Sequence, residues 1–301
     1  MKLMLKILIV FWMVMGAFAQ CDSQENKPVS LQARQEFTLI TYNIYRDYFT
    51  RNDPASPLSW GKRKEGMISL LEAYKPDILC MQEDDWIQGE DIRQALNFNK
   101  VGVSRYTASE EVTEKSKLGD YMGIYYNPKR FRVLDKGYFF FSETPDIPSK
   151  SWDADATSLC NWTKMEDLNR KITFYIFNTH LDYIGAQTRM HSVQILKERI
   201  PNIVKDSPII LTGDMNDSEN SAPLQYLKTF LKDSYKESVQ APAGPYGTFN
   251  DFKPDYDLAK YKFDYILVGG KVSVLNYKVI DEKRNGNFPS DHLPVFCNLK
   301  L

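Results

Sequence analysis

The chain has 301 residues, of which 43% are hydrophobic and 13% aromatic, so it can bury a sizeable core in one large domain or in two. Its formal net charge is −1, from 38 Lys and Arg against 39 Asp and Glu. A charge this close to zero excludes a basic field over the whole chain, of the kind that concentrates nucleic acid or anionic membranes. It does not exclude a local basic patch.

The first twenty residues have the pattern of a secretory signal. Lys2 and Lys6 precede the apolar run ILIVFWMVM, and the sequence AFA follows it, which predicts cleavage near Gln20. The apolar run is short for a membrane span, which argues against an N-terminal transmembrane anchor. Lipid attachment through Cys21 is the minor alternative, although Gln20 is a poor residue directly before it. We therefore expect a secreted or periplasmic protein with no transmembrane segment after the signal.

The rest of the chain reads as one domain. We assign residues 1–20 to the signal, 21–36 to a polar linker and 37–301 to the domain, because no repeat, low-complexity stretch or long linker divides the chain after Phe37. Helical periodicity appears at 60–74, 186–200 and 222–233. Strands mixed with helices predict an α/β or α+β fold built in layers. Short apolar runs predict strands at 37–42, 77–82, 122–126, 172–178, 208–213, 263–269 and 293–299.

The cysteines do not indicate a disulfide scaffold or a zinc site. Cys80 and Cys297 lie inside strand-like apolar runs, so we expect buried free thiols. Cys160 has no assignment, and no Cys or His spacing is typical of zinc ligands.

Polar residues gather where the apolar runs end or begin. A single Asp or Asn after a strand is ordinary turn chemistry. Six such clusters, two of them containing histidine in a chain with three histidines, indicate a site assembled at the strand ends. The clusters are Asn43; Glu83; Asn178, His180 and Asp182; Asp214 and Asn216; Asp264; Asp291 and His292.

The side chains in these clusters indicate which metal and which reaction the site favours. Their oxygen ligands suit Mg²⁺ or Mn²⁺, with Ca²⁺ as an alternative, better than zinc. Carboxylates around such a cation, with histidines beside them, suit the attack of water on a phosphoryl centre. No phosphate-binding loop, nucleophile elbow or dinucleotide fingerprint is present, which argues against kinases, serine hydrolases and NAD enzymes.

In order along the chain, the motifs TYNIY, MQE, NTHLD, LTGDMND, FDYIL and SDHLPV resemble those of the endonuclease/exonuclease/phosphatase superfamily. The resemblance covers residues 37–299, and FSETPDIPSKSWDA with GTFNDF resembles a secreted bacterial branch. It implies a four-layer αββα sandwich, in which two mixed β-sheets pack face to face and helices cover both outer faces. It also implies that Glu83 is the principal metal ligand, with Asn43 and Asp291 as further metal or phosphate ligands.

The resemblance implies catalytic roles for five more residues. Asp214 would orient or deprotonate the attacking water, and Asn216 would hold a phosphate oxygen. His180 would stabilise charge or protonate the leaving oxygen. His292 would act as a base or a phosphate ligand, oriented by Asp264.

A further set of residues is assigned to substrate binding on weaker grounds. Asp120 stands where we expect a glutamate that would steady His180, and Asp182 is the alternative for that role. Trp152 and Phe249 line either the substrate cleft or only their own loops. Two asparagines complete the set, Asn178 and Asn250.

Three other polar residues are expected to lie outside the site. Asp84 and Asp85 read as solvated loop charges, and His191 reads as a solvated histidine on a helix.

Three functions are compatible with these residues. The first is a secreted, metal-dependent hydrolase of phosphodiesters, with nucleic acid, a phospholipid headgroup or a small diester as substrate. The net charge does not point to nucleic acid. The second is a phosphomonoesterase acting on sugar or inositol phosphates, which would need extra Lys or Arg beside the site. The third is a non-catalytic binding module on the same fold. The sequence gives no oligomeric state.

Overall fold

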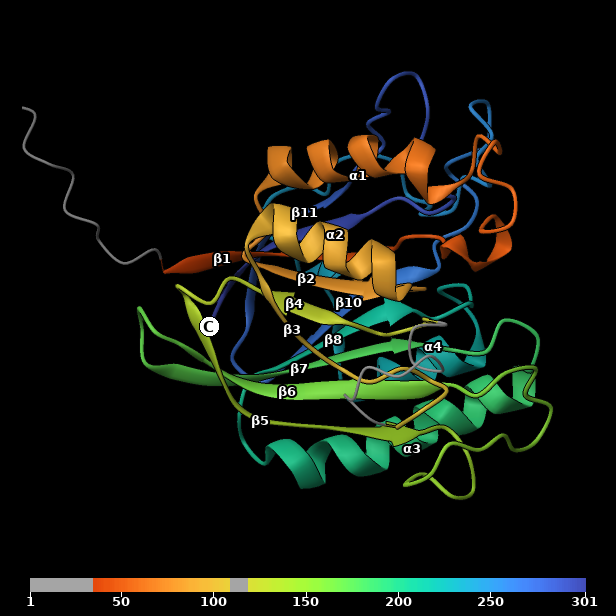
Figure 1. The fold of residues 1–301 in the computed structure, drawn as a ribbon. Coiled ribbons are helices and arrows are strands. Elements are labelled where there is room, and N and C mark those ends of the chain that lie inside the picture. Colours follow the sequence, from red (N-terminus) through yellow and green to blue (C-terminus); the bar gives the residue numbers. More distant parts are fainter. Residues whose placement is uncertain (1–34, 109–118) are drawn as a thin grey trace, which may run out of the picture. The chain divides into compact units, whose positions relative to one another are not determined.

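A computed structural model describes residues 35–108 and 119–301 of the chain (Figure 1). The expected signal, Cys21 and nearly all of the expected linker lie outside the described residues. The described residues all belong to one unit of contacts, Ala33–Leu301. None of the helices in the described part is long and apolar enough to cross a membrane.

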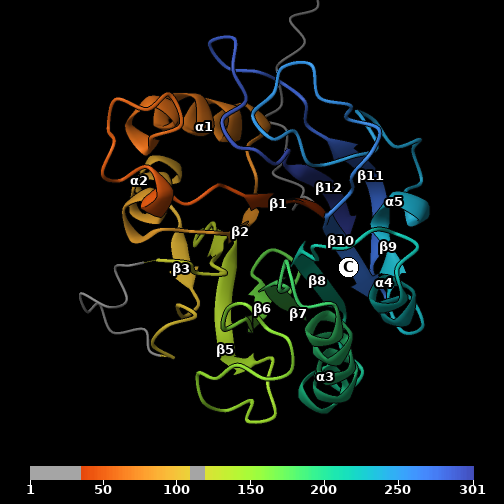
Figure 2. The same ribbon diagram turned by 90° about the vertical axis from the view of Figure 1, so that its right-hand side faces the viewer.

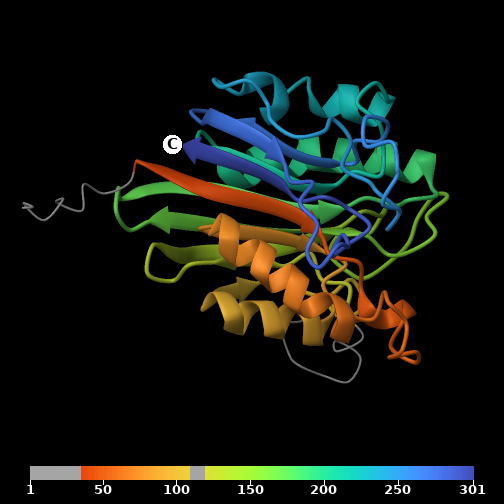
Figure 3. The ribbon, with the colours of Figure 1, turned by 90° about the horizontal axis from the view of Figure 1, so that it is seen from above.

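Six strands form the first sheet, in the order β11-β12-β1-β2-β4-β3. β1 and β2 are parallel, and the other neighbours are antiparallel. Pairing of Glu36 with Lys300 brings the start of β1 beside the chain's C-terminus, as Figure 3 shows. The strands are β1 (Glu36–Asn43), β2 (Ile78–Gln82), β3 (Asn99–Val101), β4 (Ile124–Tyr126), β11 (Ser273–Val279) and β12 (Val295–Lys300).

Six strands also form the second sheet, in the order β5-β6-β7-β8-β10-β9. Here β7 and β8 are the parallel pair. Each sheet is therefore mixed, with a single parallel pair near its centre. The strands are β5 (Phe131–Phe140), β6 (Leu159–Asp167), β7 (Ile172–His180), β8 (Ile209–Asp214), β9 (Lys232–Asp233) and β10 (Asp264–Gly269).

Helices cover both outer faces (Figures 1 and 2). α1 (Trp60–Tyr74) and α2 (Trp86–Leu96) lie on the first sheet, and α3 (Ala186–Val204) and α4 (Ala222–Leu227) lie on the second. Two short helices, η1 (Asp47–Phe49) and α5 (Ser234–Glu237), belong to connections. The expected αββα sandwich is confirmed.

Strand β7 shows how the sequence produces these layers. Successive side chains of a strand point to opposite faces of its sheet. Phe174 and Ile176 enter the core between the sheets, whereas Tyr175 and Phe177 pack in the core that holds the buried side chains of α3. A strand buried on both faces is apolar along its whole length, which is why this run was recognisable in the sequence.

All seven expected strands and all three expected helices are present, but the third helix is shorter than its pattern predicts. α4 ends at Leu227, because Lys232 and Asp233 pair with Val268 and Leu267 as strand β9. The sheet pairing overrides the helical periodicity there. No sequence pattern predicted β3, β5, β6, β9, β11 or α2.

The expectation of buried free thiols at Cys80 and Cys297 is confirmed, and Cys160 is also free and buried. Burial raises the pKa of Cys80 and of Cys297 to about 12. All three therefore behave as small apolar groups of the core.

Arg63 on α1 forms hydrogen bonds to two segments of the site, the chain directly after Asn43 and the chain just before Asp291. Its Nη1 donates to the carbonyl oxygens of Ile44 (2.9 Å) and Pro289 (2.8 Å), and its Nη2 donates to the carbonyl oxygen of Tyr45 at 2.6 Å. Its Nε donates to the carbonyl oxygen of Leu58 at 2.7 Å. The side chain is buried, so it supplies donors that water cannot replace.

We expect Arg63→Met to lower the free energy of unfolding by roughly 3–5 kcal/mol, because four carbonyl groups, two of them fully buried, lose charged donors. The neighbouring Lys62 is exposed, so Lys62→Met is the matched control and should change it by less than about 0.5 kcal/mol. Urea unfolding of both variants measures the difference. Equal stabilities would show that Arg63 does not hold these segments.

Candidate active site

The register of the second sheet lines up three of the predicted site residues at one edge. β7 and β8 run parallel with His180 opposite Asp214. β10 runs antiparallel to β8 with Asp264 opposite the same Asp214. Three polar residues from separate stretches of sequence therefore stand side by side on neighbouring strands.

The first sheet brings its polar ends to the same place. Asn43 pairs with Gln82, so Glu83 follows directly beyond the end of β2. β12 runs antiparallel to β1, which places the turn before it, with Asp291 and His292, beyond the end of β1. The Ser290 hydroxyl fixes this turn by donating to the Asn43 carbonyl oxygen at 2.7 Å.

Asp214 joins the residues of the two sheets. Its Oδ2 accepts from Asn43 Nδ2 at 3.0 Å and lies 3.5 Å from His180 Nε2 and 3.6 Å from His292 Nε2. Its Oδ1 accepts from the backbone N–H of Asn216 at 2.9 Å. The residue is only 1% exposed. One buried carboxylate thus contacts both histidines of the site.

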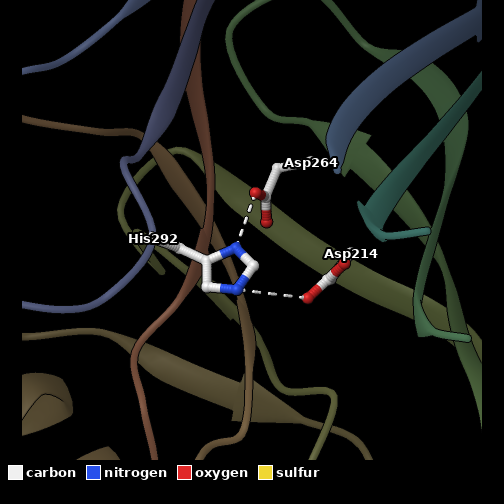
Figure 4. Close-up of side chains that lie close together, drawn as sticks. All are labelled: Asp214, Asp264 and His292. Atoms are coloured by element: carbon white, nitrogen blue, oxygen red, sulfur yellow. Dashed lines mark hydrogen bonds and ion pairs between the residues drawn. The ribbon is translucent and has the colours of Figure 1, made fainter. Parts of the chain in front are cut away.

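His292 lies between two carboxylates (Figure 4). Its Nδ1 is 2.8 Å from Asp264 Oδ2, and the ring of Phe249 packs edge-on against it with centroids 5.1 Å apart. Burial opposes charge on the imidazole, but the carboxylates of Asp264 and Asp214 outweigh it and hold the pKa of His292 well above its usual range. The ring therefore keeps its proton and presents an N–H at Nε2.

Glu83 and Asp291 are two carboxylates on the same cleft without a cationic partner. Neither forms an ion pair with a Lys or Arg of the described residues. The pKa of Asp291 is raised to about 7, chiefly by burial, with the His292 charge opposing the shift and the Glu83 charge adding to it. Glu83 accepts from Asn43 Nδ2 at 3.2 Å and has a left-handed backbone with φ of 54°.

Two sets of residues at this edge could hold a cation. Ligand atoms of Asp214, Asp264 and His292 lie within 4.8 Å of one another. His292 Nδ1 is already hydrogen-bonded to Asp264 at 2.8 Å, however, and its Nε2 forms an ion pair with Asp214 at 3.6 Å, so this set is held together without a metal. Glu83 and Asp291 repel each other until a positive charge comes between them, and a hard divalent cation prefers such oxygen ligands. The second set fits the metal better.

His180 does not have the partner that the sequence predicts. Its Nε2 lies 2.9 Å from Asn216 Nδ2, and its buried Nδ1 has no hydrogen-bond partner in the described part of the chain. Asp120, expected to steady this imidazole, instead pairs with Arg46 at 2.5 Å and Arg105 at 3.0 Å. The Asp120 carboxylate thus binds two guanidinium groups and not the His180 ring.

Asp182 does not replace Asp120 beside His180 either. Its carboxylate accepts from four backbone N–H groups at 2.7–3.1 Å, which belong to Asp155, Ala156, Ile184 and Gly185. It therefore fixes the loops around the cleft.

Three residues assigned to substrate binding lie elsewhere. Asn178 is fully buried between the sheets, where its amide bonds both sheets, and Asn250 is fully buried with its amide donating to the Ser290 carbonyl oxygen. Neither has surface to offer a substrate. Trp152 stacks on His191 of α3 with centroids 4.2 Å apart, so the stack also shields the histidine expected to be solvated.

The two aspartates after Glu83 are buried and not solvated as the sequence suggested. Asp84 contacts Lys100 Nζ at 3.0 Å and accepts from the Tyr125 hydroxyl at 2.5 Å, while Asp85 pairs with Arg51 at 2.5 Å. Both therefore anchor the chain that carries Glu83.

A cleft of about 470 Å³ opens over the site. Glu83, Asp291 and His180 line one part of it, and Arg46 and Arg105 line another. The sequence did not single out these arginines, because both stand in loops and Arg105 approaches the site only through its pairing with Asp120. Arg46, three residues after Asn43, was the one within reach of a sequence argument.

Comparisons with known proteins agree with this geometry. The model of the Endonuclease/Exonuclease/phosphatase family matches residues 40–292. The structure of a mannosyl-6-phosphatase from Bacteroides thetaiotaomicron is 29% identical, with a TM-score of 0.79 over 88% of this chain and 100% of that one. A 3′-5′-exoribonuclease subunit of the CCR4-Not complex from Debaryomyces hansenii is 22% identical over 93% of this chain but only 41% of its own length. An uncharacterized protein of Acanthamoeba polyphaga mimivirus is 30% identical over 59% of this chain and 66% of its own.

We expect Asp264→Asn and His292→Ala each to lower kcat by roughly 10²–10⁴, the range of a positioned proton-transfer group. The double variant should be little slower than His292→Ala alone, because residues that act as a unit are not additive. His191→Ala, which removes the histidine outside the site, should keep the rate within about twofold. Multiplied losses in the double variant would show that the two residues work separately.

We expect Mg²⁺ or Mn²⁺ to raise the melting temperature more at pH 8 than at pH 6. The pKa of Asp291 is raised from 3.8 to about 7 in the folded protein, so this carboxyl favours folding when protonated and loses that contribution as the pH rises through about 7. A cation offsets the repulsion above that pH, whereas below it protons compete for the site. Glu83→Gln should remove most of the shift and the exposed Glu72→Gln none of it. Equal shifts at both pH values would count against Asp291 as a ligand.

Proposed function

Since this chain belongs to the endonuclease/exonuclease/phosphatase family, we propose that it is a divalent-metal-dependent phosphoesterase whose preferred substrates are phosphomonoesters of sugars. The observation that carries the proposal is the cleft itself. It is lined by the carboxylates of Glu83 and Asp291, which form no ion pair with a described Lys or Arg, and by two arginines, while His292 directly follows Asp291 and is paired to Asp264. Carboxylates suit a metal, and arginines suit a highly charged phosphate.

Each residue has a role consistent with its contacts. Glu83, Asp291 and Asn43 would hold the cation, which when bound would offset phosphoryl charge and lower the pKa of the attacking water. Asp214 Oδ2, whose contacts include both imidazoles, is placed to accept the proton of that water. His292 keeps its proton beside Asp264 and would donate to a phosphoryl oxygen.

His180 and Asn216 form the remaining pair. Asn216 Nδ2 donates to the Leu181 carbonyl oxygen at 2.8 Å, which orients the amide toward His180 Nε2. The His180 ring lines the cleft, and its Nδ1 has no hydrogen-bond partner among the described residues. This pair would therefore contact the leaving oxygen and stabilise its developing charge.

Two observations favour monoesters over diesters. A phosphomonoesterase needs extra Lys or Arg beside the site, and Arg46 and Arg105 line the cleft. The mannosyl-6-phosphatase resembles this chain over its whole length, whereas the chain spans about two fifths of the curated exoribonuclease subunit described above. A sugar monophosphate is also of a size that suits a cleft of about 470 Å³.

A second candidate is hydrolysis of phosphodiesters, including those of single-stranded nucleic acid. Phe49 and Tyr183 line the cleft with 57% and 65% of their surfaces exposed. Exposed rings of this kind stack on bases, although they also stack on sugar rings. The exoribonuclease relatives agree with this candidate.

A hydrolysis screen decides between the two candidates. We expect phosphate release from hexose 6-phosphates, mannose 6-phosphate included, and from p-nitrophenyl phosphate, with complete loss in EDTA and recovery on adding Mg²⁺ or Mn²⁺. Hydrolysis of bis-p-nitrophenyl phosphate or of an RNA oligonucleotide should have a kcat/KM at least about tenfold lower. A higher kcat/KM for either diester would make the second candidate correct. Metal-dependent binding without hydrolysis of any ester would indicate a binding module.

A further inference from the structure

Arg46, Arg105 and Asp120 form a charged cluster on the cleft wall that the hydrogen-bond chain around His292 does not use. Arg46 Nη1 donates to Asp120 Oδ2 at 2.5 Å, and Arg105 Nη2 lies 3.0 Å from Asp120 Oδ1. Asp120 is buried. Two guanidinium groups thus share the single carboxylate of Asp120, and both arginines border the cleft.

The Arg46 guanidinium is held in one orientation. Besides Asp120, its Nη1 donates to the Tyr106 hydroxyl at 3.0 Å. The guanidinium carbon lies 4.8 Å from the ring centroid of Phe49 and 5.1 Å from that of Tyr48. Its Nε and Nη2 make no hydrogen bond to any residue that the structure describes, and neither is among the buried atoms that lack partners. These donors therefore face the cleft.

Arg46 is also tied to the reacting end of the cleft. Its backbone N–H donates to Glu83 Oε2 at 3.2 Å. The backbone of Arg46 contacts the proposed metal ligand Glu83, so its guanidinium lies no farther from that carboxylate than the length of one arginine side chain. A phosphoryl group beside Glu83 and Asp291 would lie within reach of the free donors.

We propose, building on the proposed function, that Arg46 binds the non-reacting oxygens of a phosphomonoester and selects the dianion over a diester. Near neutral pH a monoester carries close to two negative charges and several free oxygens. The guanidinium fork matches two such oxygens, whereas a lysine ammonium offers only a point charge. A diester has one charge less and places an ester carbon on one of these oxygens. Asp120, which Arg105 contacts through its other carboxylate oxygen, positions Arg46.

The test compares Arg46→Met and Arg46→Lys with the wild type on p-nitrophenyl phosphate and bis-p-nitrophenyl phosphate. We expect Arg46→Met to lower kcat/KM for the monoester roughly 10–100-fold and for the diester by less than about threefold. Arg46→Lys should lie between, because it keeps the charge and loses the fork. Asp120→Asn should move the monoester-to-diester ratio the same way by a smaller factor, because the amide oxygen keeps one acceptor for Arg46.

Arg51→Met is the matched control, because Arg51 also pairs with a carboxylate, that of Asp85, from a nearby position but does not line the cleft. It should leave the ratio unchanged. Equal losses on both substrates in Arg46→Met would overturn the proposal, and so would an unchanged monoester rate.

A binding measurement separates this proposal from the proposed function. Titration calorimetry with inorganic phosphate and Mg²⁺ should show about tenfold weaker binding to Arg46→Met than to the wild type. If the wild type hydrolyses no ester, the proposed function fails, while weaker phosphate binding by the variant still supports the Arg46 site. The Arg46 proposal is overturned if the wild type and Arg46→Met bind phosphate with equal affinity, or if the wild type binds no phosphate.

Discussion

The site depends on one buried oxygen atom, Asp214 Oδ2. It accepts a hydrogen bond from Asn43, which belongs to the first sheet, and it lies within 3.6 Å of both His180, at the end of β7, and His292, in the turn before β12. A displacement of either sheet would break one of these contacts. The relative position of the two sheets is therefore the constraint that the chemistry requires.

Buried polar bonds behind the site fix that position. Gln82 Nε2 donates to Asn178 Oδ1 at 2.6 Å, and Asn178 Nδ2 donates to the Met81 carbonyl oxygen at 2.9 Å, so the end of β2 is bonded directly to β7. Apolar packing alone tolerates small shifts between sheets, whereas a satisfied buried network specifies one arrangement. Arg63 adds a similar constraint by bonding the chain beyond β1 to the turn before Asp291. The Gln82–Asn178 bonds and the Arg63 bonds therefore support the site without involving the reacting groups themselves.

The backbone at the site is strained in several places. Tyr45, Glu83, Asp120 and Asn216 all have φ between 48° and 59°, a region that non-glycine residues seldom occupy. Each such residue costs of order 1–3 kcal/mol and persists only where its surroundings determine it. The Arg63 bond to the Tyr45 carbonyl oxygen and the Asp214 bond to the Asn216 N–H are examples of that support. The molecule thus gives up stability to aim these side chains into the cleft.

How far the sequence could predict the molecule follows from the range of each interaction. Strands such as β7 and β8 were recognisable because burial on both faces makes them apolar throughout. β5 was not, because it carries exposed polar residues such as Arg132 and Lys136 and a bulge between Val133 and Asp135 breaks its alternation. The strand-end residues could be found because their position depends on the local pattern. The Arg46–Asp120–Arg105 cluster could not, since the loop after β1 and the connection between β3 and β4 come together only through tertiary pairing. For the same reason Asn178 and Asn250 read as site residues when they are buried supports.

The most direct test of this account is the position of the metal. Crystals grown with Mn²⁺ and inorganic phosphate would locate the ion by its anomalous scattering. We expect the anomalous peak of Mn²⁺ between the carboxylates of Glu83 and Asp291, with His292 Nδ1 still paired to Asp264. A peak coordinated by Asp214, Asp264 and His292 would contradict it, because the residues assigned here to proton transfer would then be the metal ligands.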